Sequence, residues 1–192
     1  MIINKLFPKC AFYFILLAFL IVSCQNTEPH YLTVKKDIYK IDIPDHMEET
    51  DKLNSEASLQ YQNLFKELYI IILDEPKKDF NELISDDYYA DKYSTDVKGY
   101  TDFVLDNYDY ETEVTTTDPE AVKINGLDAL IHNIEERNTA GYDIFFKVAY
   151  IEGRNNYYRV MVWTLSEYKE KYRETMERMI NSFKETDRSR RH

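Results

Sequence analysis

The spacing of apolar and polar residues changes along the chain and marks out strands and helices in turn. Alternation or β-branching, both typical of strands, predicts strands at residues 38–43, 57–63, 113–117, 142–151 and 156–164. A further strand is expected at residues 65–73, where Leu68–Leu73 is an unbroken apolar run with side chains on both faces. We therefore expect this strand to be central in a sheet and covered on both sides.

Three segments have the three- to four-residue apolar spacing of helices. Pro76 is expected at the first position of a helix over residues 76–84, where proline is tolerated. A second helix is expected over residues 95–107. Ser166 is expected to cap the last helix, whose apolar stripe is Leu165, Tyr168, Tyr172, Met176, Met179 and Phe183.

Two turns are expected to join neighbouring strands as hairpins. Asn125-Gly126 tolerates positive φ angles and connects strands at residues 122–124 and 127–136. Glu152-Gly153-Arg154-Asn155 connects the last two strands. The order of elements predicts an α+β fold, in which helices pack on the faces of an antiparallel β-sheet.

The amino terminus has the features of a secretory leader. Lys5 and Lys9 precede an apolar run of 13 residues, Cys10–Val22. A membrane-spanning helix needs about 20 apolar residues, so this run fits the hydrophobic region of a signal peptide better. An uncleaved anchor and an ordinary secretory signal are the alternatives.

The end of this run, Ile21-Val22-Ser23-Cys24, resembles a bacterial lipobox. The resemblance implies cleavage between Ser23 and Cys24, attachment of a diacylglycerol to the Cys24 thiol and further acylation of the new amino terminus. Two or more acyl chains anchor a protein stably in a bilayer. We therefore divide the chain into a signal peptide (1–23), a lipidated tether (24–37), a single domain (38–185) and a basic disordered tail (186–192).

Composition narrows the classes of function. The chain has 24 Lys and Arg against 35 Asp and Glu, and removal of Lys5 and Lys9 would take the formal charge from −11 to −13. Nucleic acid needs a cationic surface, so we expect no nucleic-acid partner. Repulsion from anionic lipid is expected to keep the body of the domain away from the bilayer. The four glycines are isolated and form no phosphate-binding loop, and we expect no cofactor.

The acids and tyrosines concentrate in one segment. Residues 74–120 hold 15 Asp and Glu against four Lys. Tyrosine offers a large, rigid area with a polar tip, so this mixture is typical of a surface that binds a protein or a sugar. The candidate interaction surface consists of Tyr88, Tyr89, Tyr93, Asp106, Asp109, Glu111 and Glu113.

Two other interpretations of this segment stay open. Asp109, Glu111 and Glu113 would share one face of a strand and could bind Ca²⁺, although no EF-hand loop is present. A solvated acidic face is the simplest alternative. The four histidines show no metal-ligand spacing, so we expect surface or pairing roles for them, and no metal or catalytic site is selected.

Several stretches of the domain resemble one known family. They are "YKIDIP", "VKINGLDALI", "IEGRNNYYRVMVWT" and "MERMINSFKE", and the likeness extends over residues 38–185. They are similar to the PsbP/MOG-like α/β/α sandwich, whose members include the photosystem II extrinsic protein, a Ran-binding protein and DcrB-like bacterial lipoproteins. The resemblance implies a sandwich without shared catalytic residues, in a family that mostly binds proteins or assists assemblies.

These observations together predict a membrane-anchored envelope lipoprotein without catalytic activity. The bilayer would hold it through acylated Cys24, and another envelope protein would bind its interaction surface. The residue after Cys24 is Gln25 and not Asp. By analogy with sorting rules, the absence of Asp at this position favours the outer over the inner membrane. A small-molecule or metal-binding module and a hydrolase are the alternatives.

Overall fold

The computed structural model describes residues 29–89, 91–108 and 114–186. The segment predicted to be a signal peptide, the lipobox-like sequence with Ser23 and Cys24, and residues 187–192 of the expected tail lie outside them. None of the described helices has the length and apolar character needed to cross a bilayer.

Eight strands form the main sheet, and every paired strand in it is antiparallel. In order across the sheet they are β3 (Glu48–Glu49), β4 (Leu59–Asn63), β5 (Leu68–Pro76), β10 (Asn156–Leu165), β9 (Asp143–Glu152), β8 (Leu127–Arg137) and β6 (Val114–Thr116), and β7 (Glu120–Ile124) also pairs with β8. A smaller sheet joins β1 (Tyr31–Lys35), β2 (Tyr39–Pro44) and β11 (Lys184–Glu185).

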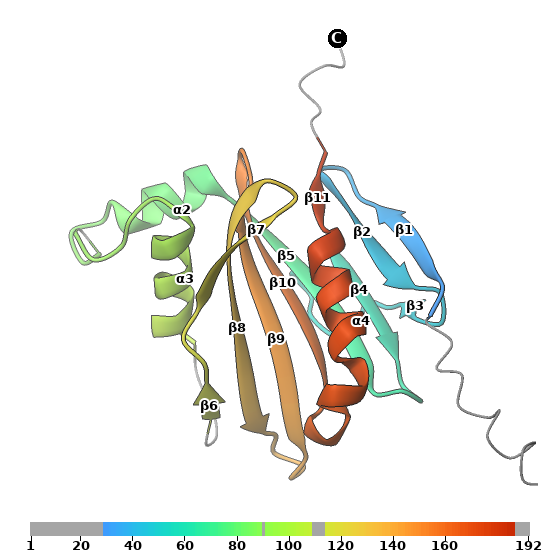
Figure 1. Cartoon of the computed structure of the whole chain (residues 1–192). Helices are drawn as coiled ribbons and strands as arrows, with labels where there is room; N and C mark the ends of the chain where they lie inside the picture. The colour runs from blue at the N-terminus through green and yellow to red at the C-terminus, as the bar shows by residue number, and fades with distance from the viewer. Residues whose placement is uncertain (1–28, 90, 109–113, 187–192) are drawn as a thin grey trace, which may run out of the picture.

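Helices and the smaller sheet cover both faces of the main sheet (Figure 1). One face carries the smaller sheet and α4 (Lys169–Ser182), which follows a 3₁₀ turn at Ser166–Tyr168. The other face carries α2 (Lys77–Ile84) and α3 (Val97–Asp106). The fold is therefore α+β with an antiparallel sheet between covering layers, as the sequence predicts.

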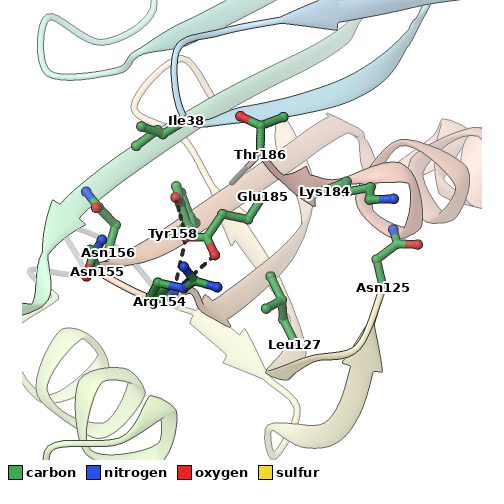
Figure 2. A pocket seen from close by; sticks show the side chains of 10 residues that line it. All are labelled: Ile38, Asn125, Leu127, Arg154, Asn155, Asn156, Tyr158, Lys184, Glu185 and Thr186. Carbon is green, nitrogen blue, oxygen red and sulfur yellow. Dashed lines mark hydrogen bonds between the residues drawn. The ribbon is translucent and has the colours of Figure 1, made fainter. Parts of the chain in front are cut away.

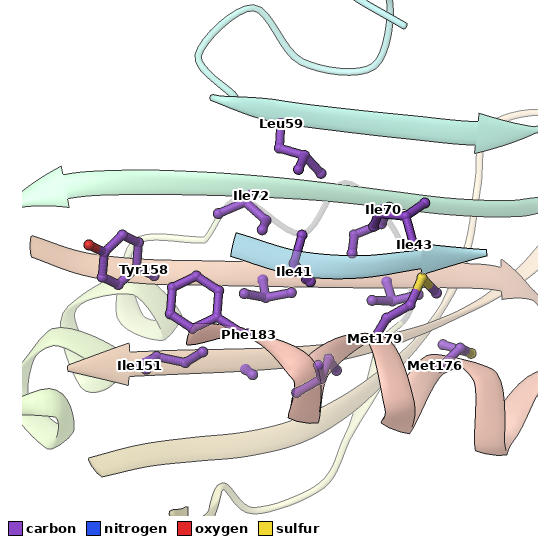
Figure 3. Close-up of a cluster of buried hydrophobic side chains, with 14 of the residues drawn as sticks. Ile41, Ile43, Leu59, Ile70, Ile72, Ile151, Tyr158, Met176, Met179 and Phe183 are labelled. Carbon is purple, nitrogen blue, oxygen red and sulfur yellow. The ribbon is translucent and has the colours of Figure 1, made fainter. Parts of the chain in front are cut away.

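The first hydrophobic core lies between the main sheet, the smaller sheet and α4 (Figure 3). The alternation in β2 buries Tyr39, Ile41 and Ile43. Met176 and Met179 of α4 are completely buried against the same face. The apolar stripe of the last helix thus contacts the sheet as its spacing predicts.

The second core lies under α2 and α3 and contains a group of packed aromatic rings among aliphatic side chains. Tyr100 and Tyr157 stack with ring centroids 4.5 Å apart, and Phe80 meets both edge-on at 5.4 Å. Burial raises the pKa of Tyr100, whose hydroxyl donates a hydrogen bond to Glu75. Burial also raises the pKa of Tyr157 to about 12, and its hydroxyl donates to the Thr95 carbonyl oxygen at 2.6 Å.

Strand β5 is central, as its apolar run predicts. Ile70 and Ile72 face the first core, whereas Ile71 and Leu73 face the second. A strand between two cores needs apolar side chains on both faces.

The two middle helices begin within two residues of the predicted starts. Pro76 is the last residue of β5 and the N-cap of α2, not its first helical residue as predicted. Asp96 caps α3 by accepting a hydrogen bond from the Gly99 amide at 2.9 Å. Hydrogen bonds from the Ser94 hydroxyl and from this amide lower the pKa of Asp96. The Glu152 carboxylate holds both helices to the sheet, since it accepts from the Val97 amide and from the Lys77 ammonium.

The assignment of Ser166 as a helix cap is wrong. The chain enters α4 through a 3₁₀ turn, the N-cap residue of α4 is Tyr168, and no side chain caps the helix. The buried Ser166 hydroxyl has no hydrogen-bond partner.

The end of the expected tether is part of the domain. Residues 31–35 form β1, which pairs with β2 along its whole length. Tyr31 and Val34 also pack against the first core, which explains why this polar-looking segment is a strand. The two-residue strands β3 and β11 were not predicted, because two residues carry no periodicity.

His132 differs from the surface or pairing role expected of it. It is 1% exposed, stacks on the Tyr150 ring at 5.5 Å, and neither ring nitrogen has a hydrogen-bond partner. Burial lowers the pKa of His132 below its ordinary 6.5. The folded protein therefore disfavours the charged imidazolium.

We predict that His132 makes the protein less stable in acid. Below pH 6.5 the unfolded chain binds a proton that the folded chain resists, so stability falls as the pH decreases from there to the lowered folded-state pKa. The slope contributed by one such group is at most about 1.4 kcal/mol per pH unit. Urea unfolding of wild type and of His132→Phe between pH 7.5 and 5 measures it.

The variant should have a smaller loss of stability in acid than the wild type. Some slope should remain, because burial also lowers the pKa of His46. Parallel pH profiles for the two proteins would show that His132 is not responsible.

Candidate functional site

Three tyrosines of the candidate interaction surface gather on the outer side of α3. Tyr89 and Tyr93 lie in the connection between α2 and α3 and meet the Phe103 ring at 5.6 and 5.3 Å. Tyr88 meets Tyr89 edge-on at 4.8 Å and is 80% exposed. We call Tyr88, Tyr89, Tyr93, Phe103 and Asp106 the tyrosine cluster.

Asp106 fixes one side of the tyrosine cluster. It accepts a hydrogen bond from the Tyr93 hydroxyl at 2.9 Å and pairs with the Lys92 ammonium at 3.3 Å. The hydrogen bond from Tyr93 and the contact with Lys92 lower the pKa of Asp106. The Lys92 ammonium also lies 4.8 Å from the centre of the Tyr93 ring. An anionic group and an aromatic surface are thus presented side by side.

The structure brings together four of the seven residues that the sequence singled out. Tyr88, Tyr89, Tyr93 and Asp106 share the tyrosine cluster, while Asp109, Glu111 and Glu113 lie outside the described residues. Phe103 was noted only as a helical position, yet it is the ring on which two of the tyrosines pack. Its position in α3, three residues after Tyr100, was the available signal.

A pocket of about 370 Å³ lies on the opposite side of the fold, beside β11 (Figure 2). Ile38 and Leu127 supply its apolar lining. Its polar lining consists of Asn125, Arg154, Asn155, Asn156, Tyr158, Lys184, Glu185 and Thr186. The sequence did not predict this pocket, because its residues come from hairpins and strands that lie far apart along the chain.

The central polar groups of this pocket bind one another. The Glu185 carboxylate accepts hydrogen bonds from the Arg154 amide at 3.1 Å and from the Tyr158 hydroxyl at 2.9 Å. The Asn125 side-chain amide donates to the carbonyl oxygens of Asn181 and Phe183 at 2.9 and 2.7 Å. These contacts attach β11 and the end of α4 to two hairpin turns, which is a structural task.

The protonation of Tyr158 also fits a structural role for these contacts. Burial, the charge of Glu185 and the hydrogen bond to it raise the pKa of Tyr158. Its phenol therefore stays protonated and donates to the carboxylate. A general base or a nucleophile at this position would need a lowered pKa instead.

Metal binding has no support among residues 29–89, 91–108 and 114–186. No group of three or more His, Cys, Asp or Glu side chains there is placed to hold an ion. The acids proposed for calcium lie in the interval 109–113, so the structure does not test that prediction.

Comparison with known proteins identifies the fold alone. No known sequence family matches the chain, and no curated protein matches it. The solution structure of cyanobacterial PsbP (CyanoP) from Synechocystis sp. PCC 6803 is similar, with 10% identity, a TM-score of 0.50, and coverage of 87% of this chain and 99% of that one.

Two further structures resemble the chain less well. The Saccharomyces cerevisiae Ran-binding protein Mog1p has 11% identity and a TM-score of 0.46, over 84% of this chain and 98% of that one. LpqN, involved in cell envelope biogenesis of Mycobacterium tuberculosis, has 9% identity and a TM-score of 0.46, over 85% of this chain and 94% of that one. The expected resemblance to the PsbP/MOG-like fold is confirmed, and the argument for it rests on the cyanobacterial protein.

We predict that Gly153 is needed for the contacts around Glu185. A Cβ atom there would lie 2.5 Å from the Tyr158 ring and 2.9 Å from the Asn156 carbonyl oxygen, and would also collide with Glu185. Such overpacking costs about 1–3 kcal/mol, so Gly153→Ala should lower the free energy of unfolding by that amount.

Asn155→Ala, in the same turn, is the matched control. Surface substitutions of this kind change stability by about 0.5 kcal/mol or less. Chemical denaturation of both variants measures the difference, and equal stability of the two would contradict the close packing described.

Proposed function

We propose that this protein is a non-catalytic envelope lipoprotein, held in the outer membrane by acylated Cys24, whose domain binds another envelope protein through the tyrosine cluster. The charged start, short apolar run and lipobox-like sequence before Cys24 support the anchor. The absence of Asp after Cys24 supports the outer membrane. The proposed binding of a partner is supported by the tyrosine cluster of the folded domain.

The exposed ring of Tyr88 is the observation that carries this proposal. Tyr88 is 80% exposed but rests on Tyr89, which in turn rests on Phe103. A rigid aromatic ring that is supported from below and open to solvent can bury its area in a partner at little entropic cost. Residues that dominate binding at protein interfaces are typically of this kind.

Charge around the cluster indicates the chemistry of the partner. Asp86, Asp87, Asp91 and Asp106 are exposed within or beside it, against two exposed cations, Lys92 and Lys98, in residues 86–106. An acidic rim around an aromatic centre complements a basic surface and repels other acidic proteins. We therefore propose a partner with a basic contact surface.

The pocket beside β11 is a weaker candidate for function. A ligand site needs polar groups that are free to bind a ligand. Glu185 and Asn125 instead bind groups of the protein itself. The small-molecule alternative thus has less support than the protein-binding one. Within the part of the chain that the structure describes, no arrangement of acid, base and nucleophile supports the hydrolase.

We predict that Cys24→Ala abolishes lipidation. Wild-type protein from the native host should begin at a Cys24 that carries diacylglycerol, and it should be recovered with outer-membrane fractions. The variant should lack the lipid mass and leave the membrane fraction. Mass spectrometry of the amino-terminal peptide and membrane fractionation measure both effects.

Cys10→Ala is the matched control, since Cys10 lies within the signal peptide. It should leave both the mass and the fractionation unchanged. Retention of Cys24→Ala in the membrane with an unaltered amino terminus would contradict the anchor.

We predict that Tyr88→Ser weakens capture of the partner by more than tenfold. Loss of a central aromatic contact typically costs 2 kcal/mol or more. Crosslinking and pull-down of the lipidated protein from solubilised native membranes, with the partner identified by mass spectrometry, provides the measurement.

Tyr142→Ser is the control for this experiment. Tyr142 is also exposed, at 59%, but lies in the turn between β8 and β9. Its substitution should leave capture unchanged. The interaction role would be refuted by equal capture with both variants, or by the absence of any stoichiometric partner of the wild type.

A further inference from the structure

The turn between β4 and β5 presents apolar side chains to solvent. The turn consists of Leu64–Glu67. Phe65 is fully exposed, with a relative accessibility of 102%, and Leu64 is 60% exposed. Lys66 follows them and is also exposed. A leucine, a phenylalanine and a lysine thus form an apolar tip with an adjacent cation, at the end of a hairpin.

This hairpin tip is held in a fixed geometry. The Asn63 side chain accepts a hydrogen bond from the Lys66 amide at 2.9 Å and donates one to the His46 carbonyl oxygen at 2.6 Å. Glu67 has a φ of +50° and returns the chain to β5. Phe65 therefore projects from a braced turn.

The tip lies at the end of the molecule from which the amino-terminal segment departs. Tyr31 at the start of β1 pairs with Pro44 at the end of β2, and the His30 carbonyl oxygen accepts from the Asp45 amide at 2.8 Å. His46 is the next residue, and its carbonyl oxygen is the one that Asn63 binds. Two hydrogen bonds and one peptide unit therefore connect the exit of the chain with the hairpin tip.

Strand directions agree with this placement (Figure 1). Strand β3 returns antiparallel along β4, with Glu48 opposite Gln62. The end of β2, the start of β1 and the end of β4 consequently lie at the same end of the fold.

Chain length limits how far this end can be from the bilayer. If Cys24 carries the lipid, five peptide units separate it from Pro29, the first described residue. In any conformation, five units span at most about 18 Å. Pro29, beside His30 at this end of the fold, must therefore lie within about 18 Å of the lipidated Cys24.

We propose that Leu64 and Phe65 insert into the interfacial region of the bilayer that holds the Cys24 lipid, with Lys66 near the lipid phosphates. This inference rests on the proposed lipidation of Cys24. Apolar side chains gain free energy on leaving water, and a lysine is attracted to anionic headgroups.

The charge distribution is compatible with this orientation. Residues 29–73, which include the tip, hold five Lys against eight Asp and Glu, whereas residues 74–120 hold four Lys against 15. In Figure 1 α2 and α3 lie on the other side of the main sheet from β1 and β2. Repulsion therefore turns the strongly acidic side outward. The repulsion that is expected to keep the body of the domain off the membrane thus acts mainly on residues 74–120, and the hairpin tip contacts the lipid.

A fluorescent label at the tip tests this inference. Phe65→Cys, in the full processed chain, is labelled with bimane and reconstituted into vesicles of phosphatidylethanolamine and phosphatidylglycerol. The introduced cysteine is the single free thiol, because Cys10 is removed and Cys24 is acylated. Lipids brominated near the headgroup should quench the label. Leu83→Cys, on α2 and 45% exposed, is the control and should not be quenched.

A second measurement avoids any effect of the label. Amide hydrogen exchange in the turn of the wild type should slow on vesicles, and Phe65→Ser should lose this protection. Phe65→Ser, like Phe65→Cys, replaces an exposed side chain, so the fold should be retained, and thermal unfolding verifies this.

The outcomes separate this inference from the proposed function. Quenching at position 65 without quenching at 83, with lipid found on Cys24, supports insertion of the tip. Lipid on Cys24 with equal behaviour at both positions, quenched or not, overturns insertion and leaves the anchor intact. Absence of lipid on Cys24 overturns the anchor, and the inference with it.

Discussion

Burial of β5 and β10 on both faces is the constraint on which the rest of the structure depends. In β10, Val160 and Val162 face the first core, whereas Tyr157 and Met161 face the second. Because side chains alternate strictly along a strand, a shift of one residue would exchange the two sets. The pairing register of these strands therefore determines the contents of both cores at once, and it positions every helix.

The two cores have different characters and different consequences. The first is built from aliphatic and methionine side chains with a few rings, and it joins the smaller sheet and α4 to the main sheet. The second combines aliphatic side chains with a connected set of aromatic rings. Phe80 contacts Tyr157 on the sheet and Phe103 on α3, and Phe103 contacts Tyr89. The tyrosine cluster is thus the outer end of a packed aromatic series, which gives the exposed Tyr88 a stiff foundation.

The sequence predicts this fold well where periodicity is strong. Residues 68–73 indicate a doubly covered strand, and Asn125-Gly126 indicates a hairpin, whose positive φ angles of 48° and 88° are present. The sequence predicts poorly those elements whose pairing partners lie far away in the chain. β11 exists because Lys184 and Glu185 lie beside β2, and no local pattern encodes that pairing.

The same distinction applies to the candidate surface. Composition identified the tyrosines and acids, since their concentration within one segment is visible in the sequence. The support from Phe103 and the hydrogen bond between Tyr93 and Asp106 depend on how the α2–α3 connection folds against α3. Spacing alone does not specify such contacts, nor does it specify the pocket that Glu185 lines.

The smaller sheet joins the two ends of the domain, since β2 pairs with β1 before it and with β11 at the far end, and the Thr186 amide donates to the Ile38 carbonyl oxygen at 2.8 Å. Contacts between residues so far apart in sequence form late in folding, because a long loop must close first. The first core thus stays open along one side until the final strand is synthesised.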